Sequence, residues 1–200
     1  MRIIKICLCL VISAAVFAEG DISTPTGRCR DSIDQVISLV KDKDLTSDIR
    51  WLRIKDVIDN SFDFQTMSQS VLATNWKRAT LGEREKFIDY FSEHLFETYR
   101  GIIESYTDEK IRYENETIEG DRAVVDTIVV TKTAEIPVNY KLKNNDGIWY
   151  AYDVEIEGSS LVNNYRNQYG IIVNNDGMEG LLAHIQSTLP KKEEVTPASD

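Results

Sequence analysis

Cysteine and histidine are scarce in this sequence of 200 residues, which contains three cysteines and two histidines. Cys7 and Cys9 lie in an apolar N-terminal segment, and removal of that segment leaves Cys29 alone. A single cysteine cannot form an internal disulfide, so stability must come from packing. His94 and His184 have no second ligand four residues away and no cysteine pair nearby, so the sequence predicts no metal site.

The sequence also lacks the short motifs that carry catalytic chemistry. It contains no Gly-x-Ser-x-Gly elbow, no glycine-rich phosphate loop and no Cys-x-x-Cys pair. Asp153 is a candidate general base, but strand alternation places it on the face opposite Tyr150 and Tyr152, which favours a structural carboxylate. We therefore predict that the protein is not an enzyme and has neither catalytic residues nor a cofactor.

The one long apolar run lies at the N-terminus. Arg2 and Lys5 precede an apolar core over residues 6–16, and Val16-Phe17-Ala18 supplies small residues at positions minus three and minus one of a cleavage site. We predict a signal peptide over residues 1–18, cleaved after Ala18, and hence an exported protein. No other segment is apolar enough to cross a membrane.

Acidic residues outnumber basic ones by 33 to 23, which gives a net charge of −10. Loss of Arg2 and Lys5 with the signal peptide would change the net charge from −10 to −12. An acidic protein repels nucleic acid phosphates and anionic lipid surfaces, so neither is predicted as a stable partner. An approach to a membrane should be transient or mediated by a docking protein.

Helical spacing of apolar residues dominates the first half of the mature chain. After a frayed lead-in over residues 19–27, this spacing predicts helices over residues 32–40 and 49–58, then a short helix capped by Asp63, with Trp76 in a linker. Thr80-Leu81-Gly82-Glu83 is a capping box that begins the longest helix, which runs to about Tyr106.

From Glu109 the apolar residues no longer recur at helical spacing but at every second position, as in a β-strand. Turn signals at residues 119–121 and 144–147 help divide the segment into four strands, the last over residues 149–156. Ser160 then caps a closing helix to about Val173, residues 174–177 end it, and one more short helix reaches Pro190. Residues 191–200 are charged and are predicted to be disordered.

The predicted fold is α+β and forms a single domain over residues 19–190. N-terminal helices and the long helix pack on a four-stranded antiparallel meander, and C-terminal helices close an apolar cavity. The predicted cavity wall combines aromatic and aliphatic side chains of the long helix, the sheet and the closing helix: Phe91, Leu95, Tyr99, Ile102, Tyr140, Tyr152, Val154, Leu161 and Tyr165.

Two stretches of the sequence carry a family resemblance. The first is Phe62-Asp63-Phe64-x-x-Met67, followed by Leu72, Trp76, Arg84-x-x-Phe87, Phe91, Leu95 and Tyr99. The second is Trp149-Tyr150-x-Tyr152-Asp153-Val154 with Glu157-Gly158-x-Ser160-Leu161-Val162-x-Asn164-Tyr165-Arg166. Together, over residues 29–189, they resemble the MlaC family of periplasmic phospholipid-binding proteins. Ala73 departs from the pattern, because the resemblance leads us to expect Gly after Leu72.

The resemblance implies a soluble shuttle in the periplasm of a Gram-negative bacterium, and we expect it to be a monomer. It would carry glycerophospholipid as cargo between an outer-membrane lipoprotein–porin complex and an inner-membrane ABC transporter complex, and so maintain outer-membrane lipid asymmetry. The nine predicted wall residues would then contact acyl chains. Arg100 and Arg166 are candidate headgroup contacts, although a solvated or carboxylate-paired arginine is the commoner role.

Two alternatives remain open from the sequence. One is a small-molecule enzyme on a cone-shaped α+β scaffold of the steroid-isomerase type, with Asp153 and a tyrosine as the acid–base pair. The other is an adaptor that binds another envelope protein through the sheet edge. A solid core between the sheet and the long helix would favour the adaptor.

Overall fold

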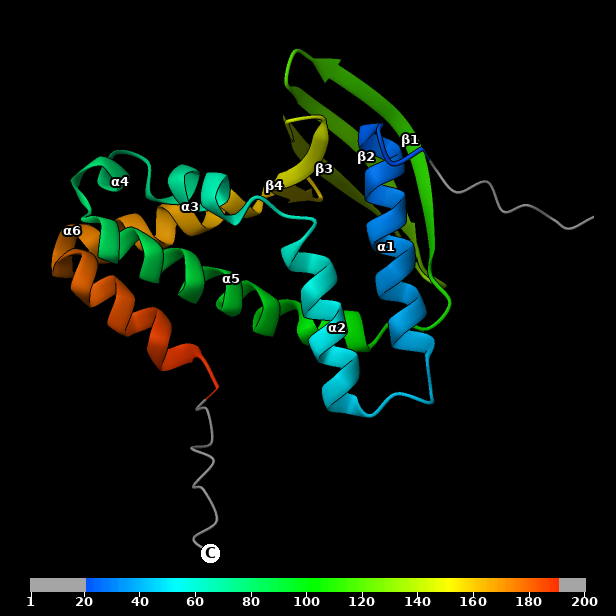
Figure 1. The fold of residues 1–200 in the computed structure, drawn as a ribbon, viewed down its shortest axis with the longest axis horizontal. Helices are drawn as coiled ribbons and strands as arrows, with labels where there is room; N and C mark the ends of the chain where they lie inside the picture. The colour runs from blue at the N-terminus through cyan, green and yellow to red at the C-terminus, as the bar shows by residue number, and fades with distance from the viewer. Residues whose placement is uncertain (1–20, 191–200) are drawn as a thin grey trace, which may run out of the picture.

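The computed structural model describes residues 21–190, which fold into six helices and one five-stranded antiparallel sheet (Figure 1). Five helices precede the sheet and one follows it, so the prediction of an α+β fold is confirmed. The predicted signal peptide and the predicted disordered tail lie outside the described residues. Within residues 21–190, no helix combines the length and the apolarity needed to cross a membrane.

Local capping signals set the starts of the N-terminal helices. The helices before the sheet are α1 (Pro25–Lys41), α2 (Ser47–Asp59), α3 (Phe64–Leu72), α4 (Thr74–Arg78) and α5 (Leu81–Glu104). Asp63 caps α3, and Thr80 and Glu83 form the predicted capping box of α5. α1 begins at Pro25 rather than near Ser32, because Thr24 caps it and Pro25 fits the first helical position. The predicted linker around Trp76 is the short helix α4.

The sheet contains the predicted meander and one additional short strand. Its strands run in chain order: β1 (Lys110–Glu119), β2 (Arg122–Val130), β3 (Glu135–Asn145), β4 (Ile148–Ile156) and β5 (Ser159–Ser160). The predicted corner after β4 is a tight turn, with Glu157 and Gly158 both at positive φ, and it lets Ser159 and Ser160 pair back on β4. The predicted number of four strands was therefore one too low.

A second segment pairs with β4 and joins the sheet to the helices. The backbone N–H of Asp63 donates to the carbonyl of Ala151 at 2.8 Å, and the N–H of Ala151 donates to the carbonyl of Ser61 at 2.9 Å. This bridge fixes Phe62 beside β4, so the Phe62-Asp63-Phe64 motif both caps α3 and ties the helices to the sheet.

The last helix, α6 (Leu161–Thr188), is bent rather than divided. The sequence predicts a break over residues 174–177, but the helix continues through Asp176 and kinks at Gly177, whose φ of 71° is non-helical. Glycine adopts this conformation without a Cβ clash. The kink turns the last part of α6 back along α5 (Figure 1).

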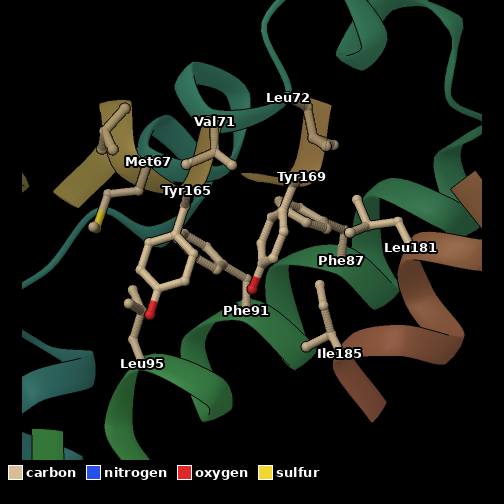
Figure 2. Close-up of a cluster of buried hydrophobic side chains, with 11 residues drawn as sticks. Met67, Val71, Leu72, Phe87, Phe91, Leu95, Tyr165, Tyr169, Leu181 and Ile185 are labelled. Atoms are coloured by element: carbon tan, nitrogen blue, oxygen red, sulfur yellow. The ribbon is translucent and has the colours of Figure 1, made fainter. Parts of the chain in front are cut away.

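Three hydrophobic clusters hold the fold together. The largest, which we call the helical core, joins α3, α5 and both halves of α6 (Figure 2). A second cluster packs Cys29 of α1 against Val125, Leu142 and Trp149 of the sheet. A third packs Trp51 and Ile54 of α2 against Phe96 of α5. α5 therefore contributes to two clusters, with Phe87, Phe91 and Leu95 in the helical core and Phe96 in the third cluster.

Ala73, which departs from the family pattern, stands in a strained conformation. It joins α3 to α4 with φ of 50° and ψ of −118°, which glycine adopts far more readily than alanine. We expect Ala73→Gly to raise the free energy of unfolding by about 1 kcal/mol, because relief of strain exceeds the added chain entropy. Urea denaturation measures the change. Ala79→Gly is the matched control, since Ala79 has an ordinary φ of −68°, and should lower stability.

Candidate functional site

An apolar cavity of about 300 Å³ lies where the three hydrophobic clusters approach one another without merging. Met67 and Leu95 of the helical core, Leu142 of the α1–sheet cluster and Phe96 of the α2–α5 cluster all reach its wall. The volume falls at the lower end of the range of small-molecule sites. The cavity is therefore bounded by rigid, well-packed elements on several sides.

The wall of the cavity is almost entirely apolar. Its side chains come from helices α1, α2, α3 and α5, from the start of α6, and from strands β3 and β4. The segment between α2 and α3 also contributes. They are Arg28, Cys29, Ser32, Ile33, Val36, Val57, Ile58, Ser61, Phe62, Phe64, Met67, Leu95, Phe96, Tyr99, Ile103, Val138, Tyr140, Leu142, Ala151, Val154, Ile156 and Leu161.

The structure brings five of the nine predicted wall residues together around this cavity. Leu95 and Tyr99 reach it from α5, Tyr140 and Val154 from the sheet, and Leu161 from the first turn of α6. The long helix, the sheet and the closing helix therefore meet at one space. The other four predicted residues lie elsewhere, for three different reasons.

Phe91 and Tyr165 belong to the helical core rather than to the cavity wall. Phe91 stacks on Phe87 with ring centroids 5.4 Å apart and meets the edge of Tyr165 at 5.2 Å. Figure 2 shows both rings enclosed between α5, α6 and α3. The apolar stripe of α5 is wide enough to contact two neighbours, and Phe91 lies on the side that packs against Tyr165 of α6.

Ile102 is 65% exposed, although it continues the apolar stripe of α5. His94 Nδ1 lies 2.9 Å from Thr188 Oγ1, so α6 ends beside His94. Ile102 lies eight residues further along α5, which is about 12 Å at the helical rise. α6 therefore ends before it can cover this position.

Tyr152 is turned away from the cavity by a β-bulge. Lys141 pairs with Asp153 and Leu142 with Ala151, so Tyr152 is an extra residue in β4. A bulge of this kind shifts the alternation of side chains by one position. Ala151 and Val154 consequently line the cavity, whereas Tyr152 packs against the helical core beneath Arg122.

The prediction missed the side of the cavity formed by α1, α2 and the segment between α2 and α3. Ile33 and Val36 come from α1, and Val57 and Ile58 come from α2. Phe62 comes from the segment after α2, and its ring stacks on that of Phe64, the first residue of α3. The apolar periodicity of α1 and α2 was visible in the sequence, but it does not say which faces surround empty space. The Phe62-Asp63-Phe64 motif was the stronger signal for this wall.

Asp153 is a buried structural carboxylate that holds the start of α6. It is 5% exposed and accepts hydrogen bonds from Ser160 Oγ at 2.7 Å, the Val162 N–H at 3.1 Å and Lys141 Nζ at 3.3 Å. Lys141 also pairs with Glu155. Asp153 does not line the cavity, as the sequence indicated. By holding the N-terminus of α6, it positions Leu161 at the cavity wall.

The cysteine and the tyrosines of the cavity wall are held in their neutral forms. Burial raises the pKa of the Cys29 thiol to about 12, with the nearby Glu116 carboxylate adding to the effect. Burial likewise raises the pKa of Tyr140 and of Tyr99 above the ordinary tyrosine value. Apart from Arg28 at its edge with a second pocket, the wall therefore carries no charged side chain at neutral pH.

Neither arginine that the sequence nominated for headgroup contact reaches the cavity. Arg166 Nε donates to the Ser70 carbonyl at 2.7 Å and clamps α6 to α3, and Arg100 lies over the Trp51 ring. The arginine that lines the cavity is Arg28, in the first turns of α1. It was overlooked because the predicted helix began too late. Thr24 and Pro25 were the start signals that could have placed it.

No group of three or more potential metal ligands occurs within residues 21–190. The fold and the site together define a class of protein: an α+β domain that encloses an apolar cavity between its helices and one face of a curved sheet. The family model described as "MlaC protein" matches residues 30–187. The chain therefore belongs to the MlaC family, as the two sequence stretches indicated.

The chain is also similar to two known proteins. The chain is 27% identical over 124 residues to the intermembrane phospholipid transport system binding protein MlaC of Haemophilus influenzae. The match covers 59% of this chain and 58% of that relative, which is less than two thirds of its length. A solved phospholipid-binding protein from Ralstonia solanacearum, in complex with a phospholipid, has a similar fold with a TM-score of 0.73. It is 23% identical, and the match covers 80% of this chain and 93% of that one.

Proposed function

We propose that this protein is a periplasmic carrier of glycerophospholipid, and that the acyl chains of the lipid occupy the apolar cavity. The observation that carries the proposal is the cavity itself, with a nearly continuous apolar wall built from the helices and one face of the sheet. Family membership and the phospholipid named for both relatives support it. The cargo would pass between an inner-membrane ABC transporter complex and an outer-membrane lipoprotein–porin complex, which would maintain outer-membrane lipid asymmetry.

The physical need for a carrier follows from the cost of hydrating acyl chains. Each CH₂ group transferred from water to an apolar site gains about 0.8 kcal/mol, so exposing a two-chain lipid costs on the order of 20 kcal/mol. Unassisted passage through an aqueous gap is therefore negligible. A protein that shields the chains removes most of this cost and can leave the polar headgroup near solvent.

Two observations favour the carrier over the two alternatives. The enzyme hypothesis requires Asp153 in the cavity, but its carboxylate faces the start of α6 and is engaged by Ser160, Val162 and Lys141. A solid core between the sheet and the long helix would favour the adaptor hypothesis, whereas an apolar cavity lies there.

Lipid content is the direct test of the proposal. Protein that is exported to the periplasm and purified without detergent should contain about one phospholipid per chain, measured by solvent extraction and mass spectrometry. The intact mass of the same sample should show a mature chain that begins at Glu19. A sample free of phospholipid would contradict carriage, and a mass that retains residues 1–18 would contradict the predicted cleavage.

A further inference from the structure

A second, polar pocket adjoins the apolar cavity in the crevice between α1 and α2. It is lined by Arg28, Gln35, Asp56, Val57, Asn60 and Ser61, and its volume is about 260 Å³. Arg28, Val57 and Ser61 line both spaces, so the polar pocket and the apolar cavity share a boundary. An amphiphile whose chains fill the cavity would meet this pocket with its polar end.

The positive side of the pocket is Arg28. One guanidinium nitrogen, Nη2, donates to the carbonyl of Asn60 at 2.6 Å. The other terminal nitrogen, Nη1, lies 3.7 Å from the Asp31 carboxylate, which is beyond hydrogen-bond distance. Within residues 21–190 the Nε atom is buried and has no hydrogen-bond partner. Arg28 therefore keeps donors for an anion such as a phosphate.

The negative side of the pocket is the C-terminal end of α2. Asp56 is exposed there, and the nearest lysine in sequence, Lys55, pairs instead with Asp59 and Glu93. The C-terminus of a helix carries a partial negative charge, which adds to the attraction for a cation. Asp31 lies close to Arg28 on α1, so a purely anionic group would meet two carboxylates beside a single arginine.

We propose that this pocket binds the headgroup of a zwitterionic phospholipid, with the phosphate on Arg28 and the ammonium group at Asp56. The inference rests on the proposed function, because the chains of the same lipid must occupy the cavity. It adds a preference of the protein between lipids. Phosphatidylethanolamine, whose headgroup carries both charges, fits Arg28 and Asp56 better than phosphatidylglycerol, whose headgroup carries only the negative charge.

Competition between the two lipids tests the preference. Delipidated protein is equilibrated with vesicles of equimolar phosphatidylethanolamine and phosphatidylglycerol, re-isolated and extracted. We expect the bound ratio to exceed the vesicle ratio about fivefold, the effect of one partly exposed ion pair. Asp56→Asn should lower the binding of phosphatidylethanolamine and return the ratio to about one. Asp59→Asn is the matched control, because Asp59 lies on the same helix outside the pocket, and should keep the preference.

The phosphate contact has its own test. Arg28→Gln should lower the binding of both lipids about fivefold, and Arg28→Lys, which keeps the charge, should recover most of it. Thermal melting of both variants shows whether loss of the Asn60 contact unfolds the protein. If Arg28→Gln is unfolded, the comparison of wild type with Asp56→Asn decides the proposal.

The outcomes distinguish failure of the headgroup pocket from failure of lipid carriage. A wild-type ratio equal to that of the vesicles, or an equal loss of preference in Asp56→Asn and Asp59→Asn, overturns the headgroup pocket while bound lipid still supports carriage. Wild-type protein that takes up no lipid at all overturns both proposals.

Discussion

Ile33→Trp should lower the amount of bound phospholipid at least about tenfold while leaving the protein folded. Ile33 lies on α1 and lines the cavity without belonging to any of the three buried clusters. A tryptophan at this position would extend into the space that we assign to acyl chains. Exclusion of two methylene groups already accounts for a tenfold loss of affinity, since each contributes about 0.8 kcal/mol and tenfold equals about 1.4 kcal/mol.

The stability of this variant should change by less than about 1 kcal/mol. Isoleucine and tryptophan have similar helix propensities, and the added ring enters empty space rather than a packed cluster. Lipid extraction gives the occupancy, and urea denaturation gives the stability. Ile171→Trp is the matched control, because Ile171 lies on α6 and is 64% exposed; it should retain lipid. A folded Ile33→Trp protein with full lipid content would show that the chains bind elsewhere.

The second large effect is expected at Asp153. Asp153→Asn should lower the free energy of unfolding by about 2–4 kcal/mol, because the buried carboxylate accepts hydrogen bonds from Ser160, Val162 and Lys141 at once. An amide of the same shape removes the charge. It also places an NH₂ donor against neighbouring groups that are themselves donors.

Equilibrium urea denaturation of Asp153→Asn and Glu155→Gln provides the comparison. Glu155 shares Lys141 with Asp153 but is more exposed, so its replacement should cost less than about 1 kcal/mol. Under native conditions Asp153→Asn should still carry lipid, because the carboxylate lies outside the cavity. Unfolding free energies of the two variants within about 0.5 kcal/mol of each other would contradict the structural role of Asp153.

The sequence by itself determined the features that depend on near neighbours in the chain. The cap at Asp63 and the capping box at Thr80 and Glu83 set helix starts because their partners lie three residues away. The alternation of apolar residues at every second position, together with the turn signals, predicted the antiparallel meander in the same way. Apart from α4, β5 and the continuity of α6, the order of helices and strands followed from the sequence alone, and with it the fold class and the family resemblance.

Tertiary structure alone decided which apolar side chains surround empty space. Phe91 and Tyr99 lie on one broad stripe of α5, yet Phe91 packs against α6 and Tyr99 reaches the cavity. Tyr152 and Val154 differ because a single bulge in β4 reverses the alternation between them. Ile102 is exposed because α6 ends beside His94. Each outcome depends on where a distant element lies, and a periodic pattern identifies an apolar face without naming the neighbour that covers it.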